Sequence, residues 1–351
     1  MVEVMFSKSR IYIDQVIKSS DVITEWDRFK CKTFFLTGAS GLIGTFLIDV
    51  IMYANEKHSL DIKVIAVGRS GENAKERFTD YWSNVDFTFI KQDVNFPIYT
   101  EIQCDYIIHG ASNTHPAAYA SDPIGTITAN VTGTQNILEF AAKQRSPRVM
   151  FLSSVEVYGE NRGDVDRFDE SYCGYIDCNT VRAGYLESKR LGEALCQAYI
   201  RAKNLDIVIP RLSRVYGPSM QQNDSKAIAQ FISKAVAKED IILKSKGDQL
   251  YSYTYVADAA TAIIFILLYG QNGEAYNISD KNSEITLKDL AEMLADIAGT
   301  RVVNEIPDAV EASGYSKATK AVLDNGKLAK LGWKSVYDIK TGLRSAVEVL
   351  Q

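Results

Sequence analysis

The sequence is poor in the residues that form metal centres and disulfide frameworks. It has three histidines and five cysteines, and the cysteines form an odd set: Cys31, Cys104, Cys173, Cys178 and Cys196. Cys173 and Cys178 are the nearest pair, but neither a second pair nor a neighbouring histidine completes a zinc site. We therefore expect no metal site, and reduced thiols as in a cytoplasmic protein.

The sequence also lacks an excess of positive charge and a long apolar run. Lysine and arginine number 39 against 44 acidic residues, a net charge of −5, which argues against nucleic acid as a partner. The N-terminal segment carries scattered charges, unlike a secretory signal. The most apolar run, AIIFILL at Ala262–Leu268, is too short to cross a bilayer. We expect neither nucleic acid nor a membrane as a partner.

Short β-branched and aromatic runs alternate with helical patterns in the first two thirds of the chain. The expected strands lie at 33–37, 64–67, 87–90, 106–108, 149–153 and 206–210. The expected helices lie at 42–56, 74–82, 125–142 and 185–203. This alternation implies right-handed crossovers between parallel strands. The predicted fold class is α/β: a Rossmann-type doubly wound parallel sheet with a smaller C-terminal substrate-binding domain.

The ends of the chain follow a different pattern from the alternating part. Residues 1–30 predict an N-terminal helical extension on the outside of the sheet, with helices at 11–17 and 22–29. Beyond Pro218, short strands lie between helices expected at 227–237, 287–297 and 339–350. We expect a dinucleotide-binding domain at 31–213 and 252–272, and a substrate-binding domain at 214–251 and 273–351.

A glycine-rich turn follows the first expected strand. The segment TGASGLIG places Gly38, Gly41 and Gly44 where this strand leads into a helix. Glycine allows the tight turn and lets backbone amides approach a pyrophosphate, which then lies at the positive end of the helix. The motif in this position predicts a dinucleotide site.

The end of the second strand bears on which dinucleotide is bound. An acidic residue there would hold the ribose 2′-hydroxyl of NAD, but this sequence has Gly68, Arg69 and Ser70. A guanidinium beside a small hydroxyl suits a 2′-phosphate, so the sequence favours NADP. Arg69 as a solvated loop residue, or stacked on adenine, is the alternative that keeps NAD open. Asp93, after the third strand, is placed to reach the adenine amino group.

Three residues form an expected proton-transfer set. Tyr185 and Lys189 in GYLESKR are four apart, so they share one face of a helix. Free tyrosine ionises near pH 10, and an adjacent ammonium stabilises the phenolate at lower pH. Ser154 ends the fifth strand in MFLSSVEVYGE, at the carboxyl edge where such sheets bind ligands. It can hydrogen-bond the substrate hydroxyl that Tyr185 deprotonates.

These motifs occur in the order seen in extended short-chain dehydrogenases/reductases, the nucleotide-sugar epimerase/dehydratase group, which the chain resembles over residues 33–350. The resemblance includes Asn130 in NVTGT and the segment RLSRVYGP. It implies catalytic roles for Ser154, Tyr185, Lys189 and Glu156. It implies a cofactor site formed by Gly38, Ser40, Gly41, Leu42, Ile43, Gly44, Arg69, Ser70, Asp93, Val94, Gly110, Ala111, Ser112, Asn130, Tyr185, Lys189, Pro210 and Ser213. It implies a substrate site formed by Ser112, Asn113, Glu156, Arg214 and Tyr251.

The sequence departs from this family at positions that bear on the reaction. The dehydratases have an Asp–Glu pair after the catalytic serine or threonine, where this chain has Val155 and Glu156. Many relatives place asparagine at Arg214 and arginine at Tyr251, so Arg214 is expected to take over a phosphate contact. Glu156 and Arg182 resemble the UDP-glucuronate decarboxylases, although those enzymes use the arginine that Tyr251 replaces.

We expect an NAD(P)-dependent enzyme that oxidises and re-reduces a nucleotide-linked sugar at C4. Epimerisation at C4 through a 4-keto intermediate is favoured. Decarboxylation, 4,6-dehydration and NADPH-dependent 4-ketoreduction are the alternatives. We expect a cytoplasmic homodimer. His109 is expected to be packed rather than reactive, and His115 lies on the loop beside the expected sugar pocket.

Overall fold

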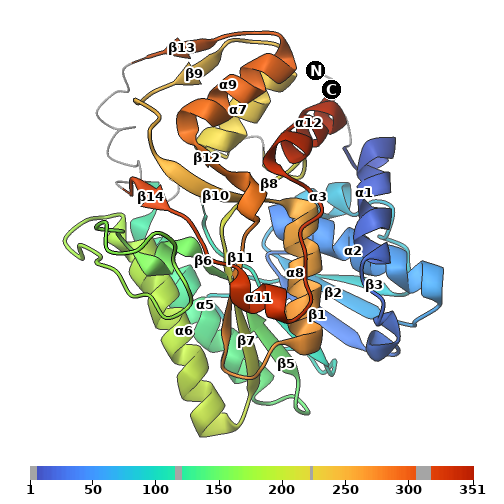
Figure 1. Ribbon diagram of the computed structural model, residues 1–351. Helices are drawn as coiled ribbons and strands as arrows, with labels where there is room; N and C mark the ends of the chain where they lie inside the picture. The colour runs from blue at the N-terminus through green and yellow to red at the C-terminus, as the bar shows by residue number, and fades with distance from the viewer. Residues whose placement is uncertain (1–5, 115–120, 222–223, 306–317) are drawn as a thin grey trace.

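An eight-stranded sheet forms the base of the computed structural model, which describes residues 6–114, 121–221, 224–305 and 318–351 (Figure 1). Its strands are β1 (Thr33–Thr37), β2 (Lys63–Gly68), β3 (Phe87–Lys91), β4 (Tyr106–His109), β5 (Arg148–Phe151), β6 (Ser153–Ser154), β7 (Asp206–Leu212) and β11 (Ala275–Ile278). They run in the order β11-β7-β5-β4-β1-β2-β3, with β6 paired to β7 and every pair parallel. The predicted Rossmann-type sheet is confirmed.

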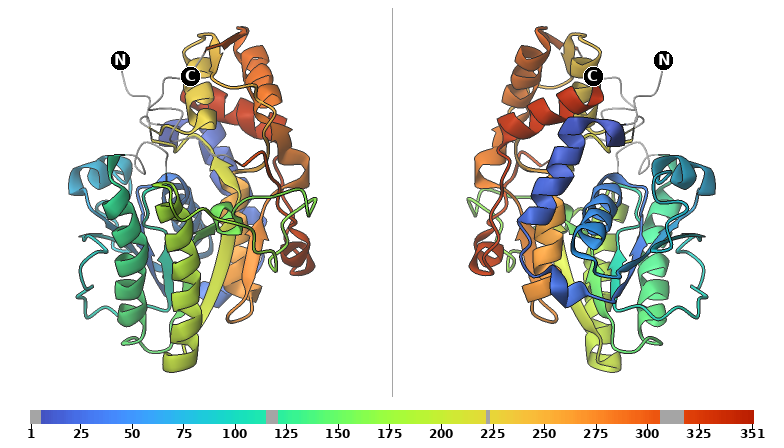
Figure 2. Two further views of the ribbon diagram at one scale, coloured as in Figure 1. Left: turned by 90° about the vertical axis from the view of Figure 1, so that its left-hand side faces the viewer. Right: turned by 90° about the vertical axis from the view of Figure 1, so that its right-hand side faces the viewer.

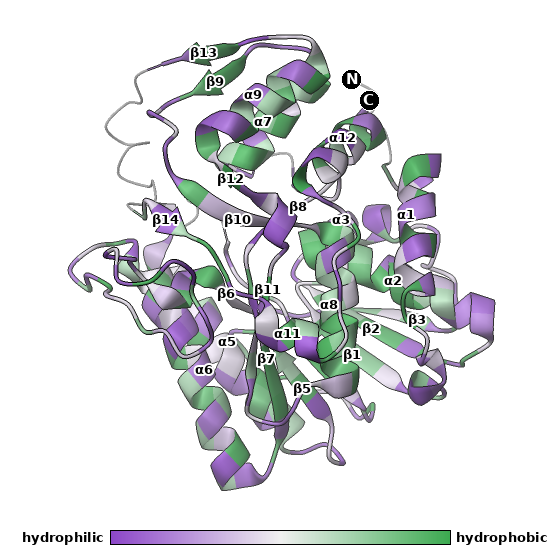
Figure 3. Cartoon of the chain, viewed as in Figure 1, coloured by the Kyte–Doolittle hydropathy of each residue, from purple (hydrophilic) through white to green (hydrophobic). Residues whose placement is uncertain are grey.

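Helices cover both faces of this sheet, because alternate strand residues point to opposite sides. Phe35 packs in a cluster with side chains from α5 (Pro123–Ala141) and α6 (Ala183–Lys203). Phe34 packs on the other side, in a cluster with residues of α2 (Leu42–His58) and α8 (Val256–Tyr269). Figure 2 shows α5 and α6 side by side on one face, and in Figure 3 α8 and the central strands of the large sheet are mainly green, the colour of hydrophobic residues.

Several helices differ from the sequence prediction. The run AIIFILL belongs to α8, which was not assigned to a helix and is buried on almost every side. Burial on all sides removes the periodicity by which an amphipathic helix is found. α3 spans Gly71–Arg77 and ends before Trp82, the expected last residue of that helix. Within the described part of the chain, no helix combines the length and hydropathy needed to span a bilayer.

The N-terminal extension packs along one side of the molecule, at the right in Figure 1. α1 (Arg10–Asp21) contacts α2, α8 and the last helix, α12 (Ile339–Leu350) (Figure 2). The Tyr12 hydroxyl donates a hydrogen bond to buried Asp49, which also pairs with Arg77. The helix expected at 22–29 is only a 3₁₀ turn at Trp26–Phe29.

A second layer of strands and helices lies above the carboxyl edge of the large sheet (Figure 1). It contains β8 (Arg214–Tyr216), β10 (Leu250–Tyr255), β12 (Glu284–Thr286) and β14 (Lys320–Ala321), the separate pair β9 (Ile241–Leu243) and β13 (Val302–Asn304), and the helices α7 (Ala227–Val236) and α9 (Leu287–Ala298). The proposed domain limits do not follow the sheets everywhere. β11 joins the large sheet through β7, whereas β10 is the centre of the smaller one.

Candidate active site

A cleft of about 730 Å³ opens at the carboxyl edge of the large sheet, between this sheet and the smaller layer. The strand order changes direction between β1 and β4, and in doubly wound sheets ligands bind at this point. The turns after β1, β2, β3 and β4 line one part of the cleft, and residues of β6, α6, β8 and β10 line the other. The cleft can therefore hold a dinucleotide beside a second ligand.

The glycine-rich turn is shaped for a pyrophosphate. Gly38 has a φ of +71°, and a Cβ there would lie 2.7 Å from the backbone of Gly110. A Cβ on Gly44 would lie 2.5 Å from the carbonyl oxygen of Gly38. Gly41 is the N-cap of α2, and no described side chain caps this helix. The amides of its first turn thus remain available to an anion, so these residues fit a dinucleotide phosphate.

His109 lies beneath this turn as a structural group. Its Nδ1 is 2.8 Å from the Thr37 hydroxyl and its Nε2 is 3.2 Å from the Thr134 hydroxyl. Complete burial, with a smaller effect of Lys189, lowers the pKa of His109 to about 3, so the ring stays neutral. Thr37 in turn accepts hydrogen bonds from the amides of Gly110 and Ala111, each at 3.2 Å. His109 is packed as expected, and His115 lies outside the described residues.

The cofactor residues expected from the sequence are divided between the cleft wall and the layer behind it. Most of them line the cleft: Gly38, Ser40, Gly41, Leu42, Ile43, Gly44, Arg69, Asp93, Val94, Gly110, Ala111, Ser112, Tyr185, Lys189 and Ser213. Ser70, Asn130 and Pro210 are not among the described residues of this lining. Ser70 accepts a hydrogen bond from the Asn73 amide as the N-cap of α3, and Pro210 lies inside β7.

Asn130 joins two elements behind the cleft. Its side-chain Oδ1 accepts a hydrogen bond from the Ser112 hydroxyl at 2.7 Å, and its Nδ2 donates to the Ser188 hydroxyl at 3.0 Å. Ser188 lies between Tyr185 and Lys189 on α6. This buried amide therefore supports the tyrosine–lysine helix instead of contacting the cleft.

Tyr185 and Lys189 lie one helical turn apart on α6 and line the cleft. Both are nearly buried, with 5% and 4% of their surface exposed. The Lys189 ammonium donates to the Leu152 carbonyl at 2.9 Å and lies 4.9 Å from the centre of the Phe151 ring. Burial lowers the pKa of Lys189 to about 8, against the opposing effect of Glu193. The lysine is therefore charged near neutral pH and close to its titration point.

A carboxylate between two guanidinium groups lies beside this pair. Glu156 Oε2 is 2.8 Å from Arg182 Nη2, and its Oε1 is 3.7 Å from Arg214 Nη2. The Ser154 hydroxyl accepts a hydrogen bond from the Glu156 amide at 3.3 Å. Arg214 Nη1 is buried and has no hydrogen-bond partner among the described residues. This end of the cleft thus carries a surplus of positive charge and an unsatisfied donor.

The expected substrate residues Ser112, Asn113, Glu156, Arg214 and Tyr251 all line the cleft. The wall also contains residues that the sequence analysis did not single out: Asp122, Gln221, Lys226, Lys244, Gln249 and Tyr253. Most of these belong to the segment 214–251 and its neighbour β10, where no motif with a known spacing was available. Gln249 Oε1 is buried and lacks a hydrogen-bond partner in the described part of the structure, so it can accept a hydrogen bond from a ligand in the cleft.

The chain is similar to nucleotide-sugar enzymes over most of its length. The model of the NAD dependent epimerase/dehydratase family matches residues 34–279. UDP-glucuronic acid decarboxylase 6 from Arabidopsis thaliana is 31% identical over 308 residues, 88% of this chain and 85% of that protein. UDP-glucuronic acid decarboxylase 1 from Xenopus tropicalis is 28% identical over 326 residues, 93% of this chain and 73% of that protein.

Solved structures of this group share the fold. UDP-glucose 4-epimerase from Thermotoga maritima has a TM-score of 0.78 at 23% identity, covering 90% of this chain and 98% of that one. dTDP-glucose 4,6-dehydratase from Streptomyces venezuelae, solved with NAD bound, has a TM-score of 0.78 at 24% identity, covering 90% and 96%. The family model extends from β1 through β11 and thus over the whole large sheet. With this match and the cleft that holds the glycine-rich turn and the Tyr185–Lys189 pair, the chain belongs to the NAD dependent epimerase/dehydratase family of nucleotide-sugar enzymes.

Proposed function

We propose that this enzyme decarboxylates a nucleotide-linked hexuronate, as the names of its UDP-glucuronic acid decarboxylase relatives indicate for those proteins. The observation that carries the proposal is the position of Glu156 between Arg182 and Arg214. Two guanidinium groups and one carboxylate leave a net positive charge where the sugar would lie, which favours an anionic sugar substituent. Epimerisation was favoured from the sequence, but the relatives support decarboxylation better.

The first chemical step depends on the pair on α6. Tyr185 takes the proton of the sugar 4-hydroxyl, and Ser154 donates a hydrogen bond to the carbonyl oxygen that forms. Charged Lys189 stabilises the tyrosine phenolate. A bound nicotinamide ring supplies the hydride acceptor for C4 and afterwards the hydride donor.

The second step needs no carboxylate base. A carbonyl at C4 makes the C6 carboxylate that of a β-keto acid, so the C5–C6 bond breaks and its electron pair forms an enolate. Carbon dioxide leaves, C5 takes a proton, and hydride returns to C4. Glu156 is engaged by both arginines, so removal of a C5 hydrogen by this residue would cost two ion pairs. Val155 also offers no acid for a leaving hydroxyl, which argues against 4,6-dehydration.

Labelled substrate tests this proposal directly. UDP-glucuronate carrying ¹³C at C6, incubated with the enzyme and NAD or NADP in D₂O, should release ¹³C-labelled carbon dioxide. The product should be a UDP-pentose with one deuterium at C5, and Tyr185→Phe should release none. Retention of the label in a UDP-hexuronate would overturn the proposal.

Epimerisation at C4 is the second candidate because Tyr251 replaces an arginine that the decarboxylases use. A positively charged site would hold the carboxylate equally well during inversion of C4. In the same experiment an epimerase gives the 4-epimer with its ¹³C retained and no deuterium at C5. A 4-ketoreductase would instead consume one NADPH for each product molecule.

The cofactor form and the oligomer are further parts of the proposal. UDP-glucuronic acid 4-epimerase from Bacillus cereus and the dTDP-glucose 4,6-dehydratase from Streptomyces venezuelae were both solved with NAD bound. Arg69 lines the cleft in this chain, and its guanidinium favours NADP.

Exposed apolar residues on α5 and α6 support a homodimer: Ile124, Ile127 and Leu191. Light scattering of the purified protein tests this assembly.

A further inference from the structure

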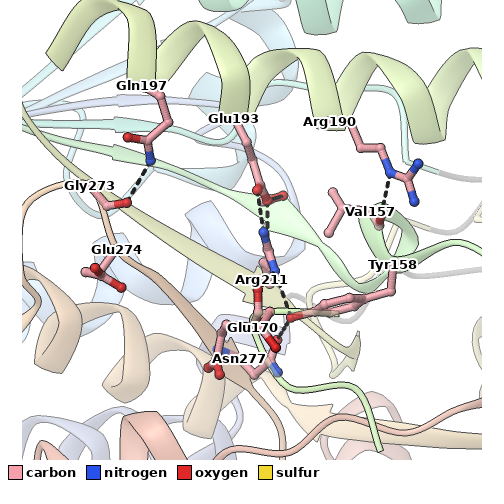
Figure 4. A network of polar contacts seen from close by, with 12 residues as sticks. Val157, Tyr158, Glu170, Arg190, Glu193, Gln197, Arg211, Gly273, Glu274 and Asn277 are labelled. Atoms are coloured by element: carbon pink, nitrogen blue, oxygen red, sulfur yellow. Dashed lines mark hydrogen bonds and ion pairs between the residues drawn. The ribbon is translucent and has the colours of Figure 1, made fainter. Parts of the chain in front are cut away.

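Glu193 lies one helical turn beyond Lys189 on α6, outside the cleft lining (Figure 4). Its carboxylate makes two parallel contacts with Arg211 of β7: Nε to Oε1 at 3.0 Å and Nη2 to Oε2 at 2.7 Å. Only about 15% of either side chain is exposed. This paired geometry is the strong form of an ion pair and fixes the orientation of both side chains.

The same carboxylate holds the strand end that carries Ser154. The Ser153 hydroxyl donates to Glu193 Oε1 at 2.6 Å. In the sheet, Ser153 lies opposite Arg211 and Ser154 opposite Leu212. Glu193 therefore connects three elements that meet at the reactive centre: α6 with Tyr185 and Lys189, β6 with Ser154, and β7.

Arg211 extends this network away from the cleft (Figure 4). Its Nη1 donates to the Tyr158 hydroxyl at 3.0 Å and to the Glu170 carbonyl at 2.9 Å. Tyr158 donates to Asn277 Oδ1 at 2.6 Å and ends the 3₁₀ turn Val155–Tyr158 that contains Glu156. The network thus braces the segment of Glu156 against β11.

The groups around Lys189, apart from its reactive partner Tyr185, bring no charge near neutral pH. On α6, burial raises the pKa of the Cys196 thiol far above its usual value, so this thiol stays neutral. From β4, His109 remains neutral because burial lowers its pKa to about 3. Phe151 and the Leu152 carbonyl of the β5–β6 segment bring no formal charge. Among the described residues that interact with Lys189, Glu193 supplies the anionic charge, and Arg211 balances it.

We propose that Glu193 is a positioning residue for the reaction: it aligns the Ser154 strand end with α6 and keeps a negative charge beside buried Lys189, while Arg211 limits the strength of that charge. The inference rests on the proposed function in assigning Tyr185 and Lys189 as the reactive pair. It concerns the protonation of Lys189 in the protein itself, and does not depend on which sugar is the substrate.

NMR titration of the full protein, labelled with ¹³C at the lysine Cε and measured without substrate, tests this. Lys189→Arg identifies the Lys189 signal, which should titrate near pH 8. Glu193→Gln should lower the midpoint by roughly one pH unit, because the buried ammonium loses its anionic neighbour. Arg211→Met should raise the midpoint of Lys189, because the negative charge of Glu193 is then no longer offset by the Arg211 cation.

Opposite shifts are the signature of the charge effect, since a purely structural role would alter thermal stability without moving the midpoint in opposite directions. Glu187→Gln, a change at a partly exposed carboxylate on the same helix, and Arg211→Lys, which keeps the charge, should leave the midpoint unchanged. An unchanged midpoint in Glu193→Gln, or shifts of both main variants in the same direction, would overturn the inference. The carbon dioxide assay does not enter this test, so the two proposals fail separately.

Discussion

The guanidinium carbon of Arg214 lies 3.5 Å from the centre of the Tyr251 ring, so the cation of β8 stacks on an aromatic ring of β10. The two strands pair in parallel, with Arg214 opposite Tyr253. The resemblance noted in the sequence implies asparagine at the first position and arginine at the second in many relatives. The stacked pair therefore places one guanidinium in this part of the cleft from the neighbouring strand, and the Tyr251 ring orients it.

The presence of the arginine at position 214 instead of 251 predicts the effect of two substitutions, one at each position. Arg214→Asn should raise the KM for UDP-glucuronate by roughly 10- to 100-fold, as expected for the loss of a charge-assisted hydrogen bond. Adding Tyr251→Arg should recover part of the loss. Arg162, which stacks on Tyr175 outside the cleft, provides the matched control Arg162→Asn with unchanged KM. Steady-state kinetics measures all three, and an unaltered KM in Arg214→Asn would contradict the role.

Tyr185→Phe should lower the turnover rate at least about 100-fold while NAD binding persists. Phenylalanine keeps the ring and its packing but cannot accept the proton of the sugar hydroxyl. Tyr199 lies on the same helix outside the cleft lining, so Tyr199→Phe should change the rate only slightly. Product formation and cofactor titration are the measurements. Retention of more than a few per cent of the rate would require another base.

Arg69 should decide the preference between the two dinucleotides. If its guanidinium meets a 2′-phosphate, NADP binds more tightly than NAD by roughly 10- to 100-fold, and Arg69→Ala removes most of the difference. Lys91→Ala, an exposed change at the end of the neighbouring strand and outside the cleft lining, should have no such effect. Calorimetric titration with both cofactors gives the comparison. Equal affinities in the unmodified protein would refute the preference.

The buried ammonium of Lys189 should appear in the pH dependence of stability. Its pKa falls from 10.5 to about 8 on folding, so between these values the unfolded chain binds more protons than the folded one. Lys189 should therefore add up to about 3 kcal/mol to the free energy of unfolding as the pH rises across this window, while buried thiols and phenols with raised pKa values, such as Cys196 and Tyr216, contribute in the opposite direction. In urea denaturation the stability difference between the unmodified protein and Lys189→Met should therefore grow with pH, whereas the difference from Lys203→Met should stay constant. Parallel curves for all three would contradict the buried charge.

The large sheet was predictable because its strands are short apolar runs between clear helix and turn signals. β1 begins and ends as expected, since TFFLT has a glycine turn directly after it. α8 was missed for the opposite reason: a helix covered on all sides has no polar stripe, and a run of Ala, Ile and Leu also fits a strand. The helix expected at 22–29 is only a 3₁₀ turn at Trp26–Phe29, although Ile23, Trp26 and Phe29 keep helical spacing and are all buried, so the spacing identified the buried face and not the type of helix.

The site was predictable where spacing along the chain fixes spacing in the fold. The glycine turn and the Tyr185–Lys189 pair meet this condition. The ion pairs do not: Glu156 meets Arg214, and Glu193 meets Arg211, only because separate segments converge at one sheet edge. Tertiary pairing of this kind leaves no pattern in a single sequence, and the Lys189 pKa, which depends on burial, is equally hidden.

The position of α1 has a consequence for the order in which the chain acquires its structure. This helix leaves the ribosome early, yet Gln15 accepts its hydrogen bond from Tyr255, and α1 also packs on α8 and α12. Its buried side, which includes Tyr12 and Val16, therefore gains full cover only when the last helix has been synthesised. Contacts between such distant segments slow the search for the native state. In nascent chains α2 can cover part of α1 early, but one side of α1 should stay uncovered until α12 has emerged, so the full docking of α1 should be a late event in folding.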